Sequence, residues 1–236
     1  MTLKTEFVTI KVSDGTSMRA YISKPSDNKK YPGIIVFQEA FGVNHHIRNI
    51  VDRLANEGYI AIAPELFHRT AEPGFEVGYT DFAKVQEHFK VITPETLEAD
   101  AKAAYDWLQQ DENVIHEKVA TIGFCLGGRV SFIANSILPL SAAVSFYGGG
   151  SHLLLDRVSR MHAPQLFFWG GLDKHILPEH IDQVISAFRN ENKAFTNVVI
   201  STADHGFHCD ERASYNEDAA KEAWAMTIAF LKNKLS

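Results

Sequence analysis

The sequence contains little cysteine and no long apolar run. Its two cysteines, Cys125 and Cys209, lie far apart in a chain of 236 residues, so they match neither a disulfide framework nor the spacing of a metal site. No apolar run is long enough to cross a bilayer, and the N-terminus lacks the apolar core of a signal peptide. We therefore expect a cytoplasmic protein, where a reducing environment keeps a reactive thiol usable.

An excess of positive charge is also lacking. The chain has 23 Lys and Arg residues against 29 Asp and Glu residues, a formal net charge of −6. This balance argues against electrostatic binding to nucleic acid or to a membrane surface, so we expect neither partner. The sequence contains no repeat, low-complexity tract or linker-like shift in composition, and we expect residues 1–236 to form a single domain.

What the chain does contain is an alternation of strand-like and helix-like segments. Two alternating stretches, 7–12 and 18–22, predict an N-terminal hairpin. Short apolar runs, typical of strands buried on both faces of a parallel sheet, follow at 33–37, 60–63, 119–123, 142–147, 165–169 and 197–201. Apolar residues at helical spacing predict helices at 46–57, 95–110, 178–190 and 214–233, and Thr93 and Pro94 open the second of these. The fold class is therefore α/β, with a mostly parallel, doubly wound sheet.

The most informative segment is 119–129, where a strand-like run ends in Gly-x-Cys-x-Gly-Gly. This pattern is typical of a nucleophile elbow, a strained strand-to-helix turn that lifts one side chain above the edge of the sheet. Gly123 and Gly127 suit such a turn because neighbouring backbone comes too close for a Cβ. Cys125 takes the position of the nucleophile. The alternative interpretation is a small buried cysteine in a glycine-rich turn.

A nucleophile of this kind requires a base and an orienting carboxylate from other strand ends. Asp173 follows the strand-like run 165–169, and His205 follows the run 197–201. The order Cys125, Asp173, His205 is the order that the α/β-hydrolase fold requires. The alternatives are that Asp173 caps the helix near Pro178 and that His205 is a surface histidine.

The loop Gln38-Glu39-Ala40-Phe41-Gly42 follows another buried strand. In the same fold this loop supplies a backbone donor, so we expect the N–H groups of Ala40 or Phe41, together with that of Leu126, to form an oxyanion hole. Glu39 is a candidate general base for Cys125. Its alternative role is that of a solvated loop carboxylate.

These segments together resemble the dienelactone hydrolase (carboxymethylenebutenolidase) family. The resemblance rests on the Gln38–Gly42 loop, the cysteine elbow, Phe146-Tyr147-Gly148, Gly170-Gly171-Leu172-Asp173 and His205-Gly206-Phe207, and it covers nearly the whole chain. It implies an α/β-hydrolase fold, a Cys125–His205–Asp173 triad, control of the thiol's protonation by Glu39, and a site lined by Tyr147. It implies no metal and no organic cofactor.

One departure concerns the substrate, which in this family is an unsaturated lactone that carries a carboxylate. The well-studied ring-cleavage members hold that carboxylate with two arginines, one in the segment before the nucleophile and one four residues after the histidine. Cys209 stands at that position here, and Arg212 follows it. We expect Arg212 and Phe41 to contact the substrate, and we interpret Cys209 as a buried or peripheral thiol. Aromatic residues gather at 79–89, where packing on the core is favoured over substrate contact.

The leading prediction is a hydrolase of lactones or small activated esters that forms an acyl-Cys125 intermediate. We expect a small-molecule substrate and a monomer or small homo-oligomer. Either Glu39 or His205 could activate the thiol. The family resemblance, together with the protection of a resting thiol from oxidation, favours Glu39 as its base. The alternatives are a thioesterase or acyl transferase with the same triad, and a non-catalytic thiol-based binding or redox module.

Overall fold

The predicted strands form a mostly parallel sheet that helices flank. The computed structural model describes residues 2–27 and 29–236. Its eight strands are hydrogen-bonded in the order β1-β2-β4-β3-β5-β6-β7-β8. The bounds are β1 Leu3–Lys11, β2 Ser17–Pro25, β3 Tyr31–Phe37, β4 Ile60–Pro64, β5 Val114–Phe124, β6 Ala142–Phe146, β7 Gln165–Gly170 and β8 Phe195–Ile200. The hairpin β1–β2 is antiparallel with Lys11 opposite Ser17, which confirms the predicted N-terminal hairpin.

The chain contains two compact units, residues 1–120 and 121–236, and strand β5 contains the junction between them. The single domain expected from the sequence stays a prediction.

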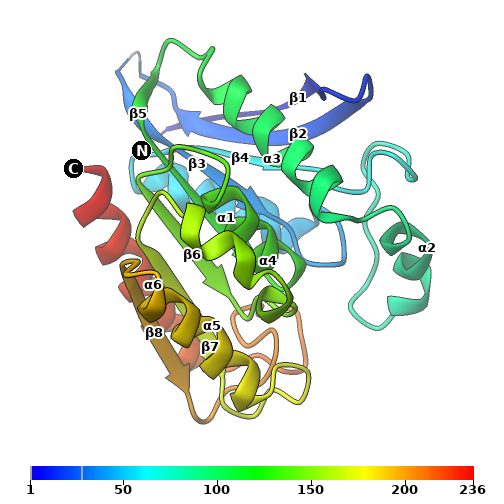
Figure 1. Cartoon of the computed structure of the whole chain (residues 1–236). Coiled ribbons are helices and arrows are strands. Elements are labelled where there is room, and N and C mark those ends of the chain that lie inside the picture. Colours follow the sequence, from blue (N-terminus) through cyan, green and yellow to red (C-terminus); the bar gives the residue numbers. More distant parts are fainter. Residues whose placement is uncertain (1, 28) are drawn as a thin grey trace. The chain divides into compact units, whose positions relative to one another are not determined.

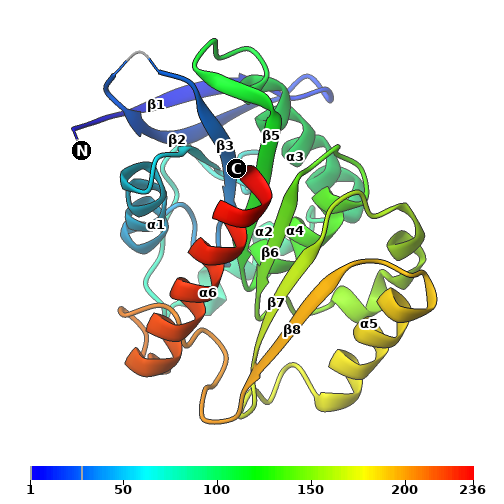
Figure 2. The same cartoon turned by 90° about the vertical axis from the view of Figure 1, so that its left-hand side faces the viewer.

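In the first unit, helices α1 (His45–Asn56) and α3 (Pro94–Leu108) lie on opposite faces of the strands (Figures 1 and 2). Asn44 caps α1, because its side chain accepts a hydrogen bond from the Ile47 N–H at 3.2 Å. Ile47, Ile50 and Leu54 are fully buried, as their spacing predicts. Burying one such side chain stabilises a fold by about 1.5–3 kcal/mol.

The capping of α3 agrees with the sequence. The Thr93 side chain accepts from the Thr96 N–H, the Thr96 hydroxyl accepts from the Thr93 N–H, and Pro94 is the first helical residue. The two threonines therefore satisfy backbone groups that the first turn of a helix leaves unpaired.

In the second unit, β6 and β7 are buried along their whole length. Helix α5 (Pro178–Asn190) lies on one face of β7 and β8, and α6 (Glu217–Leu235) lies on the other (Figures 1 and 2). Helix α4 (Leu126–Asn135) packs against β6. Strand β8 is at the end of the sheet, and its residues are half-buried or exposed.

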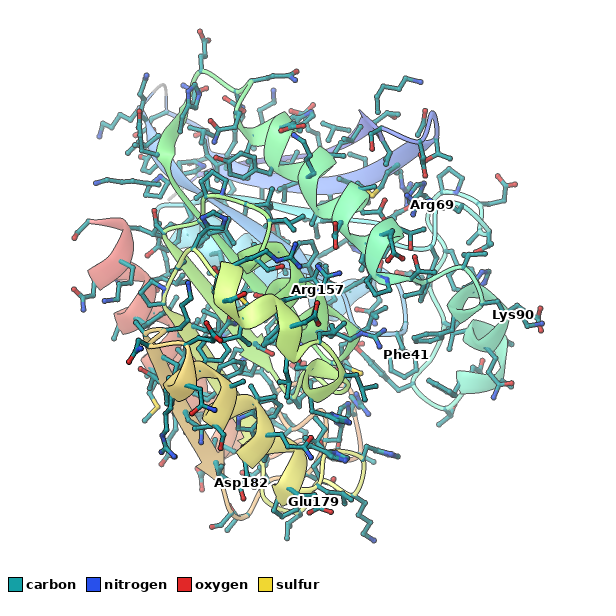
Figure 3. All side chains as sticks on the ribbon, in the orientation of Figure 1. Phe41, Arg69, Lys90, Arg157, Glu179 and Asp182 are labelled. Carbon is teal, nitrogen blue, oxygen red and sulfur yellow. The ribbon has the colours of Figure 1, made fainter. Side chains whose placement is uncertain are left out.

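Short helical segments join the main elements. In the first unit these are the 3₁₀ helix Phe82–Val85 and helix α2 (Gln86–Phe89), beyond which Lys90 extends away from the fold (Figure 3). In the second unit they are the 3₁₀ helices Ser151–Leu153 and Leu155–Arg160.

The aromatic side chains at 79–89 pack on one another and on the core. Phe82 lies 6.0 Å from Phe89 between ring centroids, and Phe41 lies 4.7 Å from Tyr79. These contacts agree with the packing interpretation, and the Phe82 side chain itself stays exposed.

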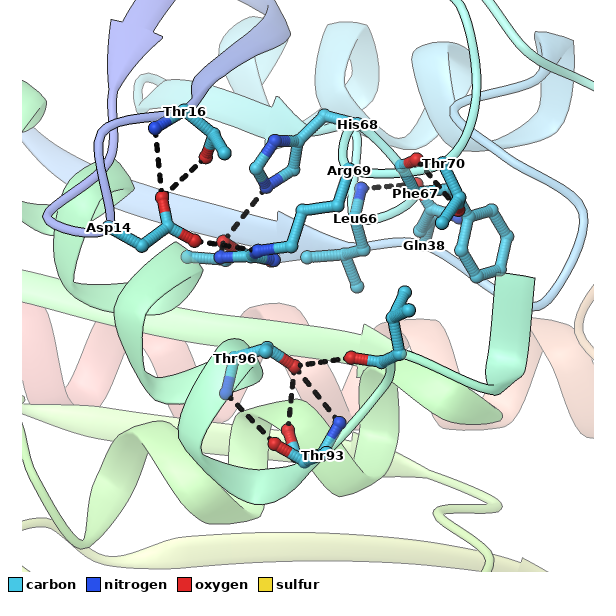
Figure 4. Close-up of polar contacts among 12 residues, drawn as sticks. Asp14, Thr16, Gln38, Leu66, Phe67, His68, Arg69, Thr70, Thr93 and Thr96 are labelled. Atoms are coloured by element: carbon cyan, nitrogen blue, oxygen red, sulfur yellow. Dashed lines mark hydrogen bonds and ion pairs between the residues drawn. The ribbon is translucent and has the colours of Figure 1, made fainter. Parts of the chain in front are cut away.

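A buried ionic network ties α3 to two loops of the first unit (Figure 4). Asp100, fully buried on α3, accepts two hydrogen bonds from the Arg69 guanidinium, at 2.8 and 2.9 Å, and lies 3.0 Å from Nε2 of His68. The Arg69 Nε also donates to Asp14 in the β1–β2 turn at 2.7 Å. The loop after β4, which carries His68 and Arg69, is therefore bonded both to α3 and to the β1–β2 turn.

Most boundaries differ from the sequence-based predictions by one or more residues, and three of these differences are as follows. Strand β5 begins at Val114 rather than at residue 119, because its first half, with His116, Glu117 and Lys118, is polar and does not extend the apolar run. Helix α6 begins at Glu217 rather than at residue 214, because the side chain of Asn216 accepts from the Ala219 N–H and starts the helix there. Strand β8 spans 195–200 instead of 197–201. Among the described residues, no helix has both the length and the apolar character needed to cross a membrane.

Candidate active site

Cys125 lies in a strained turn between β5 and α4. Its backbone has φ 54° and ψ −113°, a conformation that side chains other than glycine adopt only under constraint. The Cys125 N–H donates to the Phe146 carbonyl at 3.0 Å, which ties the turn to the end of β6. A Cβ at Gly123 would overlap the Gly127 carbonyl, so the glycine is required there. This geometry is that of the predicted elbow.

Asp173 and His205 lie in the loops after β7 and β8. Oδ2 of Asp173 is 2.7 Å from Nδ1 of His205, and the Cys125 side chain lies close enough to His205 to raise the pKa of the imidazole. The second unit therefore brings together the three side chains that the sequence predicted. Asp173 also accepts from the N–H groups of His175 and Ile176, at 2.8 and 3.1 Å. It is not the cap residue of α5, which is Leu177.

The two ionisable partners shift each other's pKa. Burial by itself would lower the pKa of His205, but the hydrogen bonds with Asp173 and Cys125 and the negative charges of both raise it to about 10. Burial by itself would raise the pKa of Asp173, but His205 and the two N–H donors hold it below its usual value. His205 therefore keeps its proton at neutral pH in this arrangement.

Tyr147 lies next to the histidine. It follows β6 with φ 38°, it is fully buried, and its ring centroid is 5.0 Å from that of His205 and 5.3 Å from that of Phe207. These rings form an apolar wall that holds the imidazole in place. Contact of Tyr147 with a substrate stays a prediction.

A cavity of about 200 Å³ opens beside His205. Its lining residues are Lys174, His175, Asp204, His205, Arg212 and Ser214. Arg212 packs so closely on Gly206 that a Cβ there would overlap the guanidinium, and Gly206 has φ +78°. The cavity contains more cationic than anionic groups, and Arg212 is the member that the sequence singled out.

Sequence reasoning did not identify Lys174 and His175. Their position in the sequence could have identified them as candidate site residues. They directly follow Asp173 in a loop at the carboxyl end of a strand, where ligands bind in such sheets.

Arg129 in the first turn of α4 was also not identified. Its side chain packs on Gly150, and its Nε is buried with no hydrogen-bond partner among the described residues. Burial lowers the pKa of Arg129, and the charge of Cys125 acts in the opposite direction. A cationic group in the turn after the nucleophile favours negative charge at Cys125.

The predicted backbone donors lie in two different units. Leu126 is buried and is the first residue of α4, so its N–H has no partner within the helix. In the first unit, Glu39, Ala40 and Phe41 follow β3 and are all buried. Among the described residues of that unit, no group accepts a hydrogen bond from the Ala40 N–H.

The Glu39 side chain is fully buried, so it is not the solvated carboxylate of the alternative interpretation.

Cys209 is fully buried, and neither cysteine is in a disulfide. The burial of Cys209 confirms its interpretation as a buried or peripheral thiol. Cys125, in contrast, is partly exposed.

Comparisons with known proteins agree with this geometry. The profile of the dienelactone hydrolase family matches residues 18–235. A relative from Synechocystis, provisionally named a carboxymethylenebutenolidase, is 36% identical over 99% of this chain and 98% of its own length. A relative from Escherichia coli K12 with the same provisional name is 33% identical over 93% of this chain and 84% of its own length.

The crystal structure of a protein from Klebsiella pneumoniae, provisionally assigned as a dienelactone hydrolase, has a TM-score of 0.89 to this chain at 32% identity. The match covers 98% of this chain and 99% of that one. The α/β-hydrolase fold and the enzyme class predicted from the sequence, a carboxylic ester hydrolase, are thereby confirmed. The chain belongs to the dienelactone hydrolase family.

Proposed function

We propose that this protein hydrolyses lactones or small activated esters with Cys125 as the nucleophile. The observation that carries the proposal is the hydrogen bond between Asp173 and His205 beside Cys125, which itself lies at a strained elbow. A nucleophile, a base and an orienting carboxylate in this relation are the arrangement of a catalytic triad.

The first half of the reaction forms an acyl-enzyme. Sγ of Cys125, as a thiolate, attacks the carbonyl carbon, and the carbonyl oxygen becomes an oxyanion. When the oxyanion collapses, the bond to the ester oxygen breaks, and that oxygen takes the proton from Nε2 of His205. In a lactone this opens the ring and leaves both product groups on Cys125.

The second half consumes water. Neutral His205 removes a proton from the water, whose oxygen attacks the thioester carbonyl. Collapse of this second intermediate releases the carboxylic acid and restores the Cys125 thiolate with a protonated His205. Asp173 holds the imidazole with Nε2 directed at the reacting atoms throughout.

The N–H groups of Leu126 and of Ala40 or Phe41 are the proposed donors to the oxyanion. For Leu126 the support is its place at the N-terminus of α4, where the helix dipole favours negative charge. For Ala40 the support is its place after β3, in the loop that supplies this donor in the fold. Glu39 in the same loop and His205 are the two proposed candidates for control of the protonation of the thiol.

The proposed substrate has a good leaving group, such as an enol lactone. A thiolate is a weaker base than an alkoxide, so it is expelled easily from the tetrahedral intermediate unless the leaving oxygen departs more readily. Arg212, beside His205 in the cavity, is the proposed contact for a polar or anionic substituent of the substrate. Tyr147 and Phe41 are the proposed apolar contacts.

The test compares Cys125→Ala with Cys209→Ala, using 4-nitrophenyl acetate and a panel of lactones with and without a carboxylate. Cys125→Ala should lose hydrolysis by more than about 100-fold, because removing a triad nucleophile leaves little catalysis. Cys209→Ala should keep its activity, and time-resolved mass spectrometry should show a transient acetyl group on Cys125 of the parent.

Residual activity in Cys125→Ala above about one hundredth of the parent would remove this residue from the nucleophile role. A stable adduct without turnover would support a thiol-based binding module instead.

A further inference from the structure

An arginine at the start of α4 has no carboxylate partner among the described residues of the second unit. Arg129 is half-buried, its Nε is fully buried without a hydrogen-bond partner there, and no carboxylate of that unit forms an ion pair with it. Removing a cation from water without a compensating anion is costly, so a group of this kind requires a physical explanation.

The helix directs this side chain back toward the elbow. Arg129 is the fourth residue of α4 and follows Cys125 by four positions, and its N–H donates to the Cys125 carbonyl at 3.3 Å. Residues four apart lie on the same face of a helix, and each Cα–Cβ bond tilts toward the helix N-terminus. The stem of Arg129 therefore extends toward the end of α4 that Cys125 precedes.

The loop after β6 covers the arginine. Gly150 has φ +84°, and a Cβ there would lie 3.2 Å from Nη1 and 3.3 Å from Cδ of Arg129. A Cβ at Gly148 would lie 3.0 Å from the backbone nitrogen of Arg129. The two glycines thus let the loop pack on both the backbone and the side chain of Arg129, and this packing limits the movement of the guanidinium.

The anion that acts on this guanidinium is Cys125. Burial lowers the pKa of Arg129, and the negative charge of Cys125 acts in the opposite direction. The attraction between two groups is mutual, so a fixed positive charge at Arg129 favours the thiolate of Cys125 over the thiol.

The other titratable groups of the second unit near this sulfur belong to the loops after β7 and β8. His205 interacts with Cys125, and Asp173 is bonded to Nδ1 of His205. Four further polar residues line the cavity beside His205, namely Lys174, His175, Asp204 and Arg212. In the proposed reaction His205 gives up its proton, whereas a guanidinium keeps its charge throughout. Arg129 is therefore a permanent positive charge close to the elbow.

We propose that Arg129 is a positioning residue for the nucleophile, whose guanidinium stabilises the Cys125 thiolate and so keeps the shared proton of the Cys125–His205 pair on the imidazole. The importance of this effect for hydrolysis rests on the proposed function. The effect on the thiolate itself does not require that the protein hydrolyse any substrate.

The test measures how the rate of alkylation of Cys125 by iodoacetamide depends on pH in the parent, Arg129→Met and Arg129→Lys. Iodoacetamide is uncharged and reacts with the thiolate, so its rate reports the thiolate fraction. Arg129→Met keeps an unbranched stem without the charge, and its midpoint should lie about one pH unit above that of the parent. Arg129→Lys should restore the midpoint to within about 0.3 of a pH unit, because stabilising a thiolate requires a charge but no planar fork.

Hydrolysis of 4-nitrophenyl acetate provides a second readout. The acidic limb of kcat/KM against pH reports ionisation of the free enzyme, so it should move to higher pH in Arg129→Met by the same amount as the alkylation midpoint. The KM for this uncharged ester should change little.

The matched control is Arg189→Met, which makes the same change in net charge at an exposed arginine in the last turn of α5. Solvent and salt screen a charge at such a position, so the midpoint should stay within about 0.2 of a pH unit of the parent.

A measurement on the parent keeps the proposal testable if Arg129→Met does not fold. The Nε resonance of Arg129, followed by NMR, should shift at the pH of the alkylation midpoint, because the thiolate forms beside the guanidinium. This step should be absent in Cys125→Ser, whose hydroxyl does not ionise in the same range.

Equal midpoints in the parent and in Arg129→Met, or an Arg129 resonance that does not respond to the ionisation of Cys125, would overturn the role of Arg129. A midpoint as high in Arg129→Lys as in Arg129→Met would also overturn it, because packing rather than charge would then be the cause. An unchanged midpoint with a raised KM only for lactones that carry a carboxylate would assign Arg129 to substrate binding instead.

The failure of the proposed function would look different. A parent that forms no acyl-Cys125 with 4-nitrophenyl acetate, but whose alkylation midpoint still rises in Arg129→Met, would overturn the hydrolysis and support the stabilisation of the thiolate.

Discussion

At the scale of single residues, the protonation of Cys125 determines how the site would work. A resting thiol needs a base before it can attack, whereas a thiolate paired with a protonated histidine is ready to react. The family resemblance seen in the sequence favoured the thiol, with Glu39 as its base. The pKa of His205 is raised to about 10, so the imidazole holds its proton at neutral pH, which is the state that a thiolate partner requires.

This difference leads to a prediction for Glu39→Gln, an isosteric change at a fully buried position. We expect Cys125 to be alkylated by iodoacetamide near neutral pH in both the parent and the variant, with rates within about 3-fold, because His205 rather than Glu39 sustains the thiolate. Labelling rates measured across pH, followed by mass spectrometry of the Cys125 peptide, provide the check. If the variant loses both labelling and lactone hydrolysis, Glu39 is the base that the sequence favoured.

At the scale of elements, the elbow joins β5 to α4 through a backbone turn that leaves no room at Gly123. We expect Gly123→Ala to destabilise the protein by at least about 2 kcal/mol, because the new methyl group would overlap the Gly127 carbonyl and the turn cannot relax without moving α4.

The matched control for this change is Gly78→Ala, since no atom lies near a Cβ at that exposed position. It should change stability by less than about 0.5 kcal/mol. Urea unfolding of the three proteins measures both values, and equal stabilities for the two variants would contradict the steric argument for the elbow.

The network around Asp100 allows a second prediction at this scale. Asp100→Ala removes the carboxylate that pairs with Arg69 and His68, and it leaves a guanidinium without its buried partner. We expect a loss of about 3–5 kcal/mol, as for other buried pairs that lose one member.

Asp106→Ala on the same helix is the control. Asp106 pairs with Lys102 at 2.7 Å, but both side chains are exposed, so we expect its loss to cost less than about 1 kcal/mol. Thermal and urea unfolding of both variants would show whether burial explains the larger contribution of the Asp100 pair to the free energy of unfolding.

At the scale of the whole molecule, the raised pKa of His205 makes stability depend on pH. A group whose pKa is higher in the folded protein than its usual value of 6.5 binds its proton more tightly when folded. Its contribution is fully present below pH 6.5, and it is lost as the pH rises from 6.5 to about 10. The slope from one such group is at most about 1.4 kcal/mol per pH unit.

Two measurements check this window. The free energy of unfolding in urea should fall more steeply between these pH values for the parent than for His205→Gln. NMR titration of the imidazole should give a midpoint near 10 that decreases in Asp173→Asn, since the hydrogen bond to Asp173 is among the main causes of the raised pKa. An imidazole that titrates at its usual value in the parent would show that the pair with Asp173 and Cys125 does not form in solution.

Much of the fold was predictable because it depends on local patterns. The apolar runs that became β3, β4, β6 and β7 are continuous, as expected for strands covered on both faces, and their burial agrees. The polar first half of β5 could not be recognised in this way, because its pairing rather than its composition makes it a strand.

The candidate site likewise has some features that the sequence predicts and others that only the structure shows. The sequence by itself determined which residues could supply the chemistry, since glycine spacing identifies the elbow and the order of strand ends identifies Asp173 and His205. Only the tertiary structure decided how strongly they interact: the 2.7 Å contact, the raised pKa of His205 and the cavity with Lys174 and Arg212. The physical reason is that a pattern along the chain reports local conformation, whereas pKa values and cavities depend on distance and burial, which arise only when distant loops meet.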